Sequence, residues 1–261
     1  MQWCRKRVHI EMLSGLCSVI MPAYNSERYI AEAIESVLQQ SYRNIELIIV
    51  DDCSSDNTGT IIQEYASDDA RVRYIKNDRN MGCAEARNIA IRYSAGKYIS
   101  FIDSDDVWLS DKLEKEIEWL ESKCCDLVYT SYAMVDADGM IQKNRHIENK
   151  VSFEMLLQEN FICFSTVLVK SCIAKQYSMI SNFFHEDYCF LLRLLKDNFV
   201  FAGLDEILVQ YRVFDENRSG NKLNAAKYRW LIYREYLKLN WLQSVWYFMK
   251  YSLNGIKKYY L

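Results

Sequence analysis

Three aspartates stand close together near the middle of the chain, and carboxylates at this spacing can bind a divalent cation. They are Asp103, Asp105 and Asp106, with Ser104 between the first two. Hard cations such as Mg²⁺ prefer oxygen ligands and are typically held by one or two carboxylates together with substrate phosphates. The cluster therefore predicts a metal and phosphate site. The alternative is an ordinary acidic turn that caps the next helix, because Asp and Ser are frequent turn and N-cap residues.

Predicted strands lead into this cluster and into two other polar segments. Residues 98–102 are mostly apolar, which predicts a short buried strand that ends at the aspartates. A strand at 17–21 ends at Pro22, the only proline of the chain, which stops the strand because it has no N–H for the ladder. A strand at 46–50 is nearly all apolar, as expected for a parallel sheet covered on both faces, and ends at Asp52.

Strand and helix patterns alternate through the first half of the chain. A strand at 72–76 and a helix from about 80 to 94 complete the series. This alternation predicts an α/β fold with right-handed crossovers and an open, mostly parallel, Rossmann-like sheet flanked by helices. Ligands of such sheets bind beyond the carboxyl ends of the strands. The three polar segments are therefore expected at one edge, which core packing alone does not require.

The second half of the chain has shorter patterns. The predicted elements are a helix from 111, a strand at 126–130, a hairpin turn at 136–139, a short helix at 153–158, a strand at 165–169, a helix that begins at His185, and short strands at 199–202 and 207–211. We predict an N-terminal extension (1–15), one main domain (16–222) and a helical, aromatic-rich tail (223–261).

Composition and charge exclude several classes of protein. The chain has 261 residues with 32 basic and 35 acidic side chains, a net charge of −3, so it lacks the basic signature of a nucleic-acid-binding protein. Its nine cysteines have no C-x-x-C spacing, which predicts reduced thiols and a cytoplasmic protein. No segment approaches the ~20 apolar residues of a membrane-spanning helix, and the N-terminus does not have the pattern of a signal peptide.

Five motifs, taken in order, resemble those of the family 2 glycosyltransferases, which have a GT-A fold. The resemblance is strong over residues 17–108, looser to 222 and weak beyond. Cys53 departs from the glycine or alanine usual at its position. The matching segments are Ser18-Val19-Ile20-Met21-Pro22-Ala23-Tyr24-Asn25, Val50-Asp51-Asp52-Cys53-Ser54-Ser55-Asp56, Asn80-Met81-Gly82 with Ala86-Arg87-Asn88, Phe101-Ile102-Asp103-Ser104-Asp105-Asp106, and His185-Glu186-Asp187.

The resemblance implies a hexosyltransferase that builds a surface polysaccharide or a lipid-linked glycan. A sugar would move from a nucleotide-diphosphate sugar, with UDP favoured, to an acceptor hydroxyl, with inversion at the anomeric carbon. Residues 16–110 would form the nucleotide-binding half of the domain and 111–222 the acceptor-binding half. Asp103 and Asp105, a D-x-D motif with Ser104 between them, would bind the donor and Mn²⁺ or Mg²⁺.

The resemblance also assigns the base pocket of the donor site. Asp52 would accept from an N–H of uracil, and Pro22, Ala23 and Tyr24 would line the pocket, with Tyr24 able to stack on the base. Two structural alternatives remain open. Asp52 could be a helix-capping turn residue, and Tyr24 could face the core.

The resemblance also implies that Asp187 is the general base, because an acceptor hydroxyl is a weak nucleophile and needs a carboxylate to take its proton. An acid at a helix start is also favourable on any helix, so a purely structural role for Asp187 is the alternative. Arg87 could hold a donor phosphate, pair with the aspartate cluster, or be an exposed helix arginine. Tyr211, Arg212 and the segment 218–222, with Ser219 and Lys222, are similar to a loop that folds over the diphosphate.

The tail combines aromatic and basic residues. Residues 225–261 contain seven Lys or Arg and a single acid, Glu235, among many Trp and Tyr. This composition is typical of a helix that lies in the headgroups of an anionic membrane, which predicts peripheral association with the inner face of the cell membrane. The alternative is a pair of helices that pack on the catalytic domain or on a second subunit.

Two other functions compete with glycosyl transfer. A sugar-nucleotide nucleotidyltransferase is similar in fold but needs a Gly-rich, basic phosphate loop after the first strand, and residues 22–25 lack it. A catalytically silent scaffold that binds nucleotide or a partner is the second, and the retained Asp103, Asp105 and Asp187 argue against it.

Overall fold

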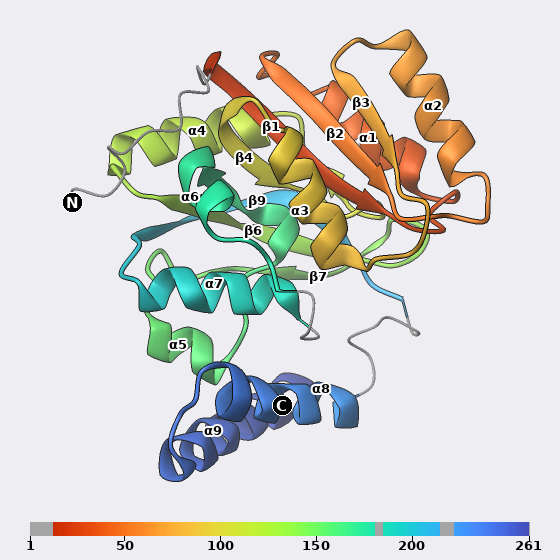
Figure 1. Ribbon diagram of the computed structural model, residues 1–261. Coiled ribbons are helices and arrows are strands. Elements are labelled where there is room, and N and C mark those ends of the chain that lie inside the picture. The colour runs from red at the N-terminus through yellow and green to blue at the C-terminus, as the bar shows by residue number, and fades with distance from the viewer. Residues whose placement is uncertain (1–12, 181–184, 215–221, 261) are drawn as a thin grey trace.

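The computed structural model describes residues 13–180, 185–214 and 222–260 (Figure 1). The strands are β1 (Leu13–Ala23), β2 (Ile45–Asp51), β3 (Val72–Lys76), β4 (Gly96–Phe101), β5 (Val107–Trp108), β6 (Leu127–Val135), β7 (Ile141–Arg145), β8 (Leu168–Lys170) and β9 (Phe201–Arg212). The helices are α1 (Ile30–Leu38), α2 (Thr58–Asp68), α3 (Cys83–Tyr93), α4 (Lys112–Lys123), α5 (Phe153–Gln158), α6 (Ser171–Gln176), α7 (Glu186–Lys196), α8 (Lys222–Leu231) and α9 (Trp241–Tyr260).

The described strands form one sheet, in the order β3-β2-β1-β4-β8-β6-β9-β5, with β7 paired to β6. The first four are parallel, as expected from the strand–helix alternation. Beyond β4 the sheet is mixed, because β8 runs antiparallel to both β4 and β6 while β6 and β9 are parallel. The α/β class with an open sheet flanked by helices is confirmed, and the parallel part belongs to the first half of the chain.

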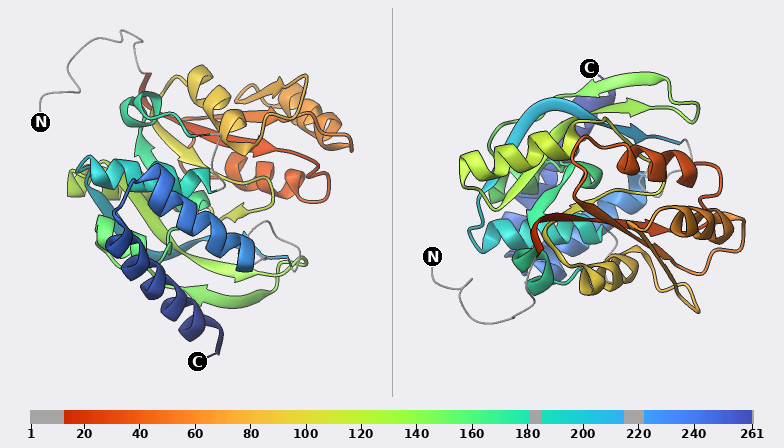
Figure 2. Two further views of the ribbon diagram at one scale, coloured as in Figure 1. Left: turned by 60° about the horizontal axis from the view of Figure 1, so that its bottom comes forward. Right: turned by 90° about the horizontal axis from the view of Figure 1, so that it is seen from above.

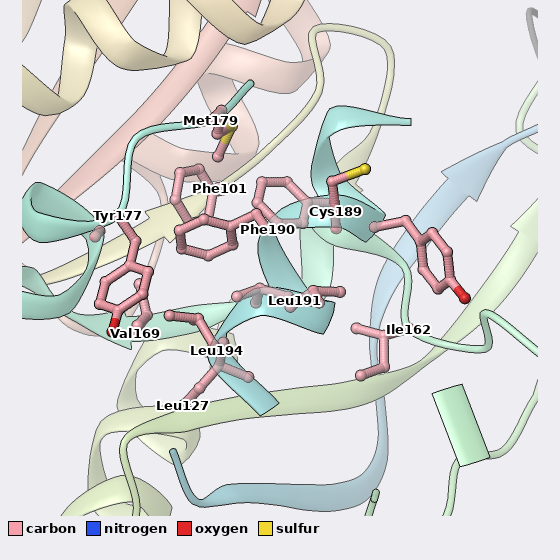
Figure 3. Packing of buried hydrophobic residues seen from close by; sticks show 14 of the residues in the cluster. Phe101, Leu127, Ile162, Val169, Tyr177, Met179, Cys189, Phe190, Leu191 and Leu194 are labelled. Carbon is pink, nitrogen blue, oxygen red and sulfur yellow. The ribbon is translucent and has the colours of Figure 1, made fainter. Parts of the chain in front are cut away.

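Two hydrophobic clusters cover opposite faces of the sheet, because successive strand residues point to opposite sides. On β1, Val19 and Met21 pack with residues of α1, α2 and α4, whereas Ile20 packs with residues of α3, α6 and α7. Figure 2 shows helices on both sides of the sheet. Figure 3 shows Phe190 and Leu191 of α7 beside Phe101 of β4, on the face of the sheet to which Ile20 belongs.

Pro22 does not stop the first strand. It pairs in register with Val50, and β1 continues to Ala23. Proline is accommodated because β4 has turned away: the last bond on that side joins Ile102 N–H to the carbonyl of Ile20. The backbone nitrogen of Pro22 points to the same side of β1 as the carbonyl of Ile20. On that side no further carbonyl of β4 needs an N–H from β1.

Two further strand predictions were wrong in detail. The strands expected at 199–202 and 207–211 are one strand, β9, in which Asp205 and Glu206 form a bulge against β6. The strand expected at 165–169 begins only at Leu168, after a 3₁₀ turn at Phe164–Thr166. Ser165 in that turn bonds to the aspartate loop, and such side-chain bonds compete with a strand ladder.

The tail packs on the main domain through one face. α8 continues into a single π-helical turn, Ile232–Tyr236, and α9 lies against α5. Ile232 and Tyr233 are fully buried in the cluster that contains α7. Figure 1 shows α8 and α9 at the end of the molecule away from β1, β2 and β3. No helix in the described residues is both long enough and apolar enough to cross a membrane.

Candidate active site

A cavity of about 750 Å³ lies at the carboxyl ends of β1, β2 and β4, where the first half of the sheet meets the start of α7. Nine of the site residues predicted from the sequence line this cavity. These residues are Pro22, Ala23, Tyr24, Asp52, Arg87, Asp103, Ser104, Asp105 and Asp187. Segments more than 160 positions apart in the sequence, at residues 22–24 and 187, therefore converge on one site.

Asp106 is used to build the site and does not face into it. Its side chain is fully buried, with Oδ2 accepting from the Ser165 hydroxyl at 2.5 Å and Oδ1 accepting from the Arg212 N–H at 2.9 Å. The Ser165 oxygen also accepts from the Asp103 N–H at 3.1 Å. Asp106 thus fixes the aspartate loop to β9 and to the turn before β8. The spacing of the motif left open whether it shares in binding a metal, and its bonds favour a structural role.

Asp103 and Asp105 carry the carboxylates that line the cavity. Burial, followed by the nearby charge of Asp103, raises the pKa of Asp105 to about 6. Like charges held together in this way disfavour ionisation, and a cation bound between them would reverse the effect. Ser104 is held by a 2.7 Å hydrogen bond between its hydroxyl and that of Ser26.

Arg87 joins the two sides of the site. It is buried on α3, and its Nη2 donates to Asp103 at 2.5 Å while its Nη1 donates to Glu186 at 3.1 Å. The guanidinium also lies 4.8 Å from the centre of the Phe164 ring. The exposed-arginine alternative is therefore wrong, and the pairing with the aspartate cluster is what the structure shows. Glu186, to which the sequence reasoning gave no role, is the second partner of this buried cation.

Asp187 enters the cavity from the first turn of α7. The preceding residue, His185, has a left-handed backbone conformation (φ 72°). The chain therefore changes direction at His185, just before α7 begins. Burial is the main cause that raises the pKa of Asp187, and the charge of Glu186 adds to it. Arg87 acts in the opposite direction because its positive charge favours the carboxylate.

Asp52 has a structural role, although not the helix-capping role considered as an alternative. Its Oδ1 accepts from Asn77 Nδ2 at 2.8 Å and from Met81 N–H at 2.9 Å, and its Oδ2 accepts from Gly82 N–H at 2.6 Å. The carboxylate thus holds the loop that leads into α3. Asp52 also lines the cavity, so a contact with a ligand is compatible with this role.

Tyr24 projects from the end of β1 with 51% of its surface exposed, so the core-facing alternative is wrong.

Arg212 was expected in a loop over the diphosphate, but its guanidinium is committed to other groups. It donates from Nε to the Asp105 carbonyl at 2.9 Å and from Nη2 to Glu32 at 2.7 Å. Ser219 lies outside the described residues, and so does the side chain of Lys222.

One lining residue, Cys83, carried no recognised signal in the sequence. It lines the cavity because α3 begins beside the aspartate loop, and a single sequence does not show that placement. A second cavity, of about 210 Å³, lies in the other half of the domain between Tyr132, Arg145 and Phe161. The Tyr132 ring is 5.9 Å from that of Tyr211, which lines the first cavity, so the two cavities are neighbours.

The family follows from comparison with known proteins. The family model described as glycosyl transferase family 2 matches residues 18–177, which include the end of β1, all of β2 to β4 and the aspartate loop. The chain belongs to this family and is a glycosyltransferase of the hexosyltransferase type.

Two curated bacterial relatives match over nearly their whole length. One is the putative teichuronic acid biosynthesis glycosyltransferase TuaG of Bacillus subtilis, with 37% identity covering 93% of this chain and 97% of the relative. Another is the UDP-Glc:alpha-D-GlcNAc-diphosphoundecaprenol beta-1,3-glucosyltransferase WfgD of Escherichia coli, with 35% identity covering 94% of this chain and 95% of the relative. TuaG is thus named for teichuronic acid biosynthesis and WfgD for glucosyl transfer to alpha-D-GlcNAc-diphosphoundecaprenol.

Solved structures show the same fold. TarS residues 1–349 of S. aureus in complex with UDP-GlcNAc align with a TM-score of 0.71 and 21% identity, covering 93% of this chain and 73% of TarS. The mannosyltransferase PcManGT of Pyrobaculum calidifontis in complex with GDP-Man and Mn²⁺ aligns with a TM-score of 0.68 and 13% identity, covering 93% and 75%. Identities this low support the likeness of fold alone.

Proposed function

We propose that the protein is an inverting, metal-dependent glycosyltransferase that moves a sugar from a UDP-sugar to a hydroxyl of a glycan or lipid-linked acceptor. One observation carries this proposal. A single cavity holds the Asp103–Asp105 carboxylates at the end of β4 and the Asp187 carboxylate at the start of α7. Glycosyl transfer needs such a pairing, with a site for the leaving diphosphate and a base for the incoming hydroxyl.

Asp187 is the general base in this mechanism. Its carboxylate takes the proton of the acceptor hydroxyl while that oxygen bonds to the anomeric carbon, and the bond from this carbon to the diphosphate oxygen breaks. One displacement of this kind inverts the anomeric carbon. A base with a raised pKa takes up a proton more readily than an ordinary carboxylate, and burial provides that shift for Asp187.

The carboxylates of Asp103 and Asp105 fit a divalent cation shared with the donor. They are hard oxygen ligands on one loop, and Asp105 titrates at about 6 because of burial and the charge of Asp103, an arrangement that a cation would relieve. Two carboxylates plus substrate phosphates is a usual ligand set for Mg²⁺. When bound, Mn²⁺ or Mg²⁺ would act as a Lewis acid that offsets charge on the departing diphosphate.

The remaining lining residues place the donor. Tyr24 offers an exposed ring at the end of β1 on which a base can stack, with Pro22 and Ala23 beside it. Asp52 would contact the base at the same time as it holds the loop before α3. Arg87 keeps Asp103 in position through their ion pair and adds positive charge to the site that would receive phosphates.

The acceptor proposal is supported by the curated relatives. WfgD and a second Escherichia coli relative, WfaP, 33% identical over 79% of this chain, are both named for transfer to alpha-D-GlcNAc-diphosphoundecaprenol. A lipid-linked acceptor of this class would require the enzyme to work at the cytoplasmic surface of a membrane. The cavity between Tyr132, Arg145 and Phe161 lies next to the donor site and would receive part of such an acceptor.

Thermal unfolding with nucleotides tests the donor site. UDP, GDP and CMP are each added with and without Mn²⁺, and a ligand at 100 times its Kd stabilises the fold by about 2.7 kcal/mol. We expect a shift in Tm with UDP that depends on Mn²⁺ and is lost in Asp105→Ala. No shift with any nucleotide would contradict the donor-site assignment, and an unchanged metal titration in Asp105→Ala would contradict the metal assignment.

A transfer assay separates the enzyme from a silent scaffold. With a lipid-linked GlcNAc diphosphate acceptor and UDP-glucose, the enzyme releases UDP and lengthens the acceptor. A scaffold would bind UDP and Mn²⁺ but release none. A nucleotidyltransferase would instead form UDP-sugar from UTP and a sugar phosphate, with release of pyrophosphate.

A further inference from the structure

Helix α9 is apolar on two opposite faces. Residues Ser244, Tyr247, Phe248 and Tyr251 form the face turned towards the domain, and Ser244 is fully buried. Four large apolar side chains form the opposite face, at the helical spacing i, i+4, i+7 and i+11: Leu242, Trp246, Met249 and Leu253, with 81%, 53%, 49% and 56% of their surface exposed. We call these four residues the outer stripe. A helix of a water-soluble domain normally turns polar residues outward, so the stripe needs an occupant.

The charged side chains between residues 237 and 254 are two lysines. Lys250 lies beside the outer stripe, with Nζ 5.0 Å from the centre of the Trp246 ring, and Lys238 is exposed just before α9. From residue 236 to the end of the chain the sequence contains no Asp or Glu. An apolar stripe with tryptophan at its centre and lysines at its margin matches the boundary between acyl chains and anionic headgroups.

This charge pattern distinguishes between the possible occupants. Two copies of α9 packed stripe to stripe would place cations against cations with no carboxylate on either helix to offset them. A bilayer with anionic lipids supplies both the apolar layer and the negative charge. We propose that the outer stripe of α9 docks the protein on an anionic lipid bilayer, with Leu242, Trp246, Met249 and Leu253 in the interface and Lys250 at the headgroups.

The docking rests on the proposed function, because a lipid-linked acceptor would give the enzyme a reason to bind a bilayer. Binding to vesicles is measured without any sugar, so it is tested independently of the transfer reaction. The inner face of α9 lies against α5, and α5 leads directly into Phe161 of the second cavity. Helix α9 therefore packs on the part of the domain that is proposed to receive the acceptor.

Co-sedimentation with lipid vesicles tests the docking. The full chain is mixed with vesicles of phosphatidylcholine alone, or of phosphatidylcholine and phosphatidylglycerol in equal parts. We expect stronger binding to the anionic vesicles, weakened by salt. The variant Leu242→Ser/Trp246→Ser should lower the partition coefficient at least tenfold, because one buried Leu-sized side chain is already worth about tenfold. Lys250→Gln should lower it by about fivefold.

Met140→Ser/Ile141→Ser is the matched control, since these two side chains are 67% and 61% exposed on the β6–β7 hairpin, away from α9. It should bind vesicles like the unmodified chain. Each variant is also tested for the UDP–Mn²⁺ shift in Tm, so that loss of the fold or of the donor site is seen separately. Equal binding to both kinds of vesicle, none at all, or full binding by Leu242→Ser/Trp246→Ser would each overturn the proposal. A dimer that this variant dissociates, without vesicle binding, would overturn it in favour of a second copy.

Discussion

Replacement of Arg87 should destabilise the fold strongly, because it is the cation that two buried or half-buried carboxylates share. In Arg87→Met, the side chain of Glu186 would keep its charge with only 10% of its surface in water. Removing one partner of a buried ion pair costs about 3–5 kcal/mol. The lost pair with Asp103 adds little to the loss of stability, because 35% of the Asp103 side chain is exposed and water can replace the arginine. We therefore expect a loss near the lower limit, about 3 kcal/mol.

Urea unfolding at pH 7.5 measures this loss as a shift in the midpoint at a constant slope. Arg92→Met is the matched control, since Arg92 lies on the same helix but 60% of its side chain is exposed in its pair with Glu85. It should change the free energy of unfolding by less than about 0.5 kcal/mol. Arg87→Met/Glu186→Gln should regain most of the stability, because the unpaired charge is gone.

The deficit of Arg87→Met should also depend on pH. Without Arg87, the folded state disfavours the ionised carboxylate of Glu186 more than the unfolded chain does, so the destabilisation is full at neutral pH and shrinks as the pH falls and this carboxylate takes up a proton. A variant as stable as the unmodified chain, or a double variant no better than the single one, would refute the role given to this buried cation.

Four further outcomes are expected. Asp187→Asn should lower turnover by about 10²-fold or more and keep the UDP shift in Tm, because a general base contributes about that much; normal transfer would remove Asp187 from the mechanism. Burial and the charge of Glu186 raise the pKa of Asp187. As the pH is lowered, kcat should therefore begin to fall at a pH above about 3.9, the usual pKa of an aspartate. A fall in kcat that begins only at or below this pH would contradict the burial argument. Asp52→Asn should cost about 1–3 kcal/mol in urea unfolding, because an amide NH₂ cannot accept from both sides of the loop before α3. Asp106→Asn should leave the Mn²⁺ titration of UDP binding unchanged, in contrast to Asp105→Ala.

The first half of the fold could be predicted because its signals are local. An apolar segment such as 46–50 that ends at acidic residues indicates both a buried parallel strand and the edge where it ends. The rule that ligands bind beyond the strand ends then gave the location of the cavity. Pro22 misled this reasoning, because whether a strand continues past a proline depends on where its neighbour ends, and that is a property of the sheet.

The second half was harder for a physical reason. β8 is three residues long and begins after a turn whose geometry depends on bonds between Ser165 and the aspartate loop, more than 50 positions earlier. Asp205 and Glu206 resemble a loop in sequence, yet they form a bulge within β9 because β6 supplies pairing on both sides of it. Patterns of polarity record which residues meet water, and they do not record which distant partner satisfies a backbone group.

The partners of the site residues show the same limit. Asp103 and Asp105 could be proposed from their types and positions, and Asp187 from the family resemblance. Nothing in the sequence singled out Glu186, since an acid in the first turn is favourable on any helix. The structure gives Glu186 a reason through Arg87, which it shares with Asp103. A single buried cation thereby couples the loop proposed to hold the donor to the helix proposed to carry the base. A shift of α7 relative to α3 would strain its bond to Glu186, so the spacing between these two parts of the site depends on the same interaction that balances their charge.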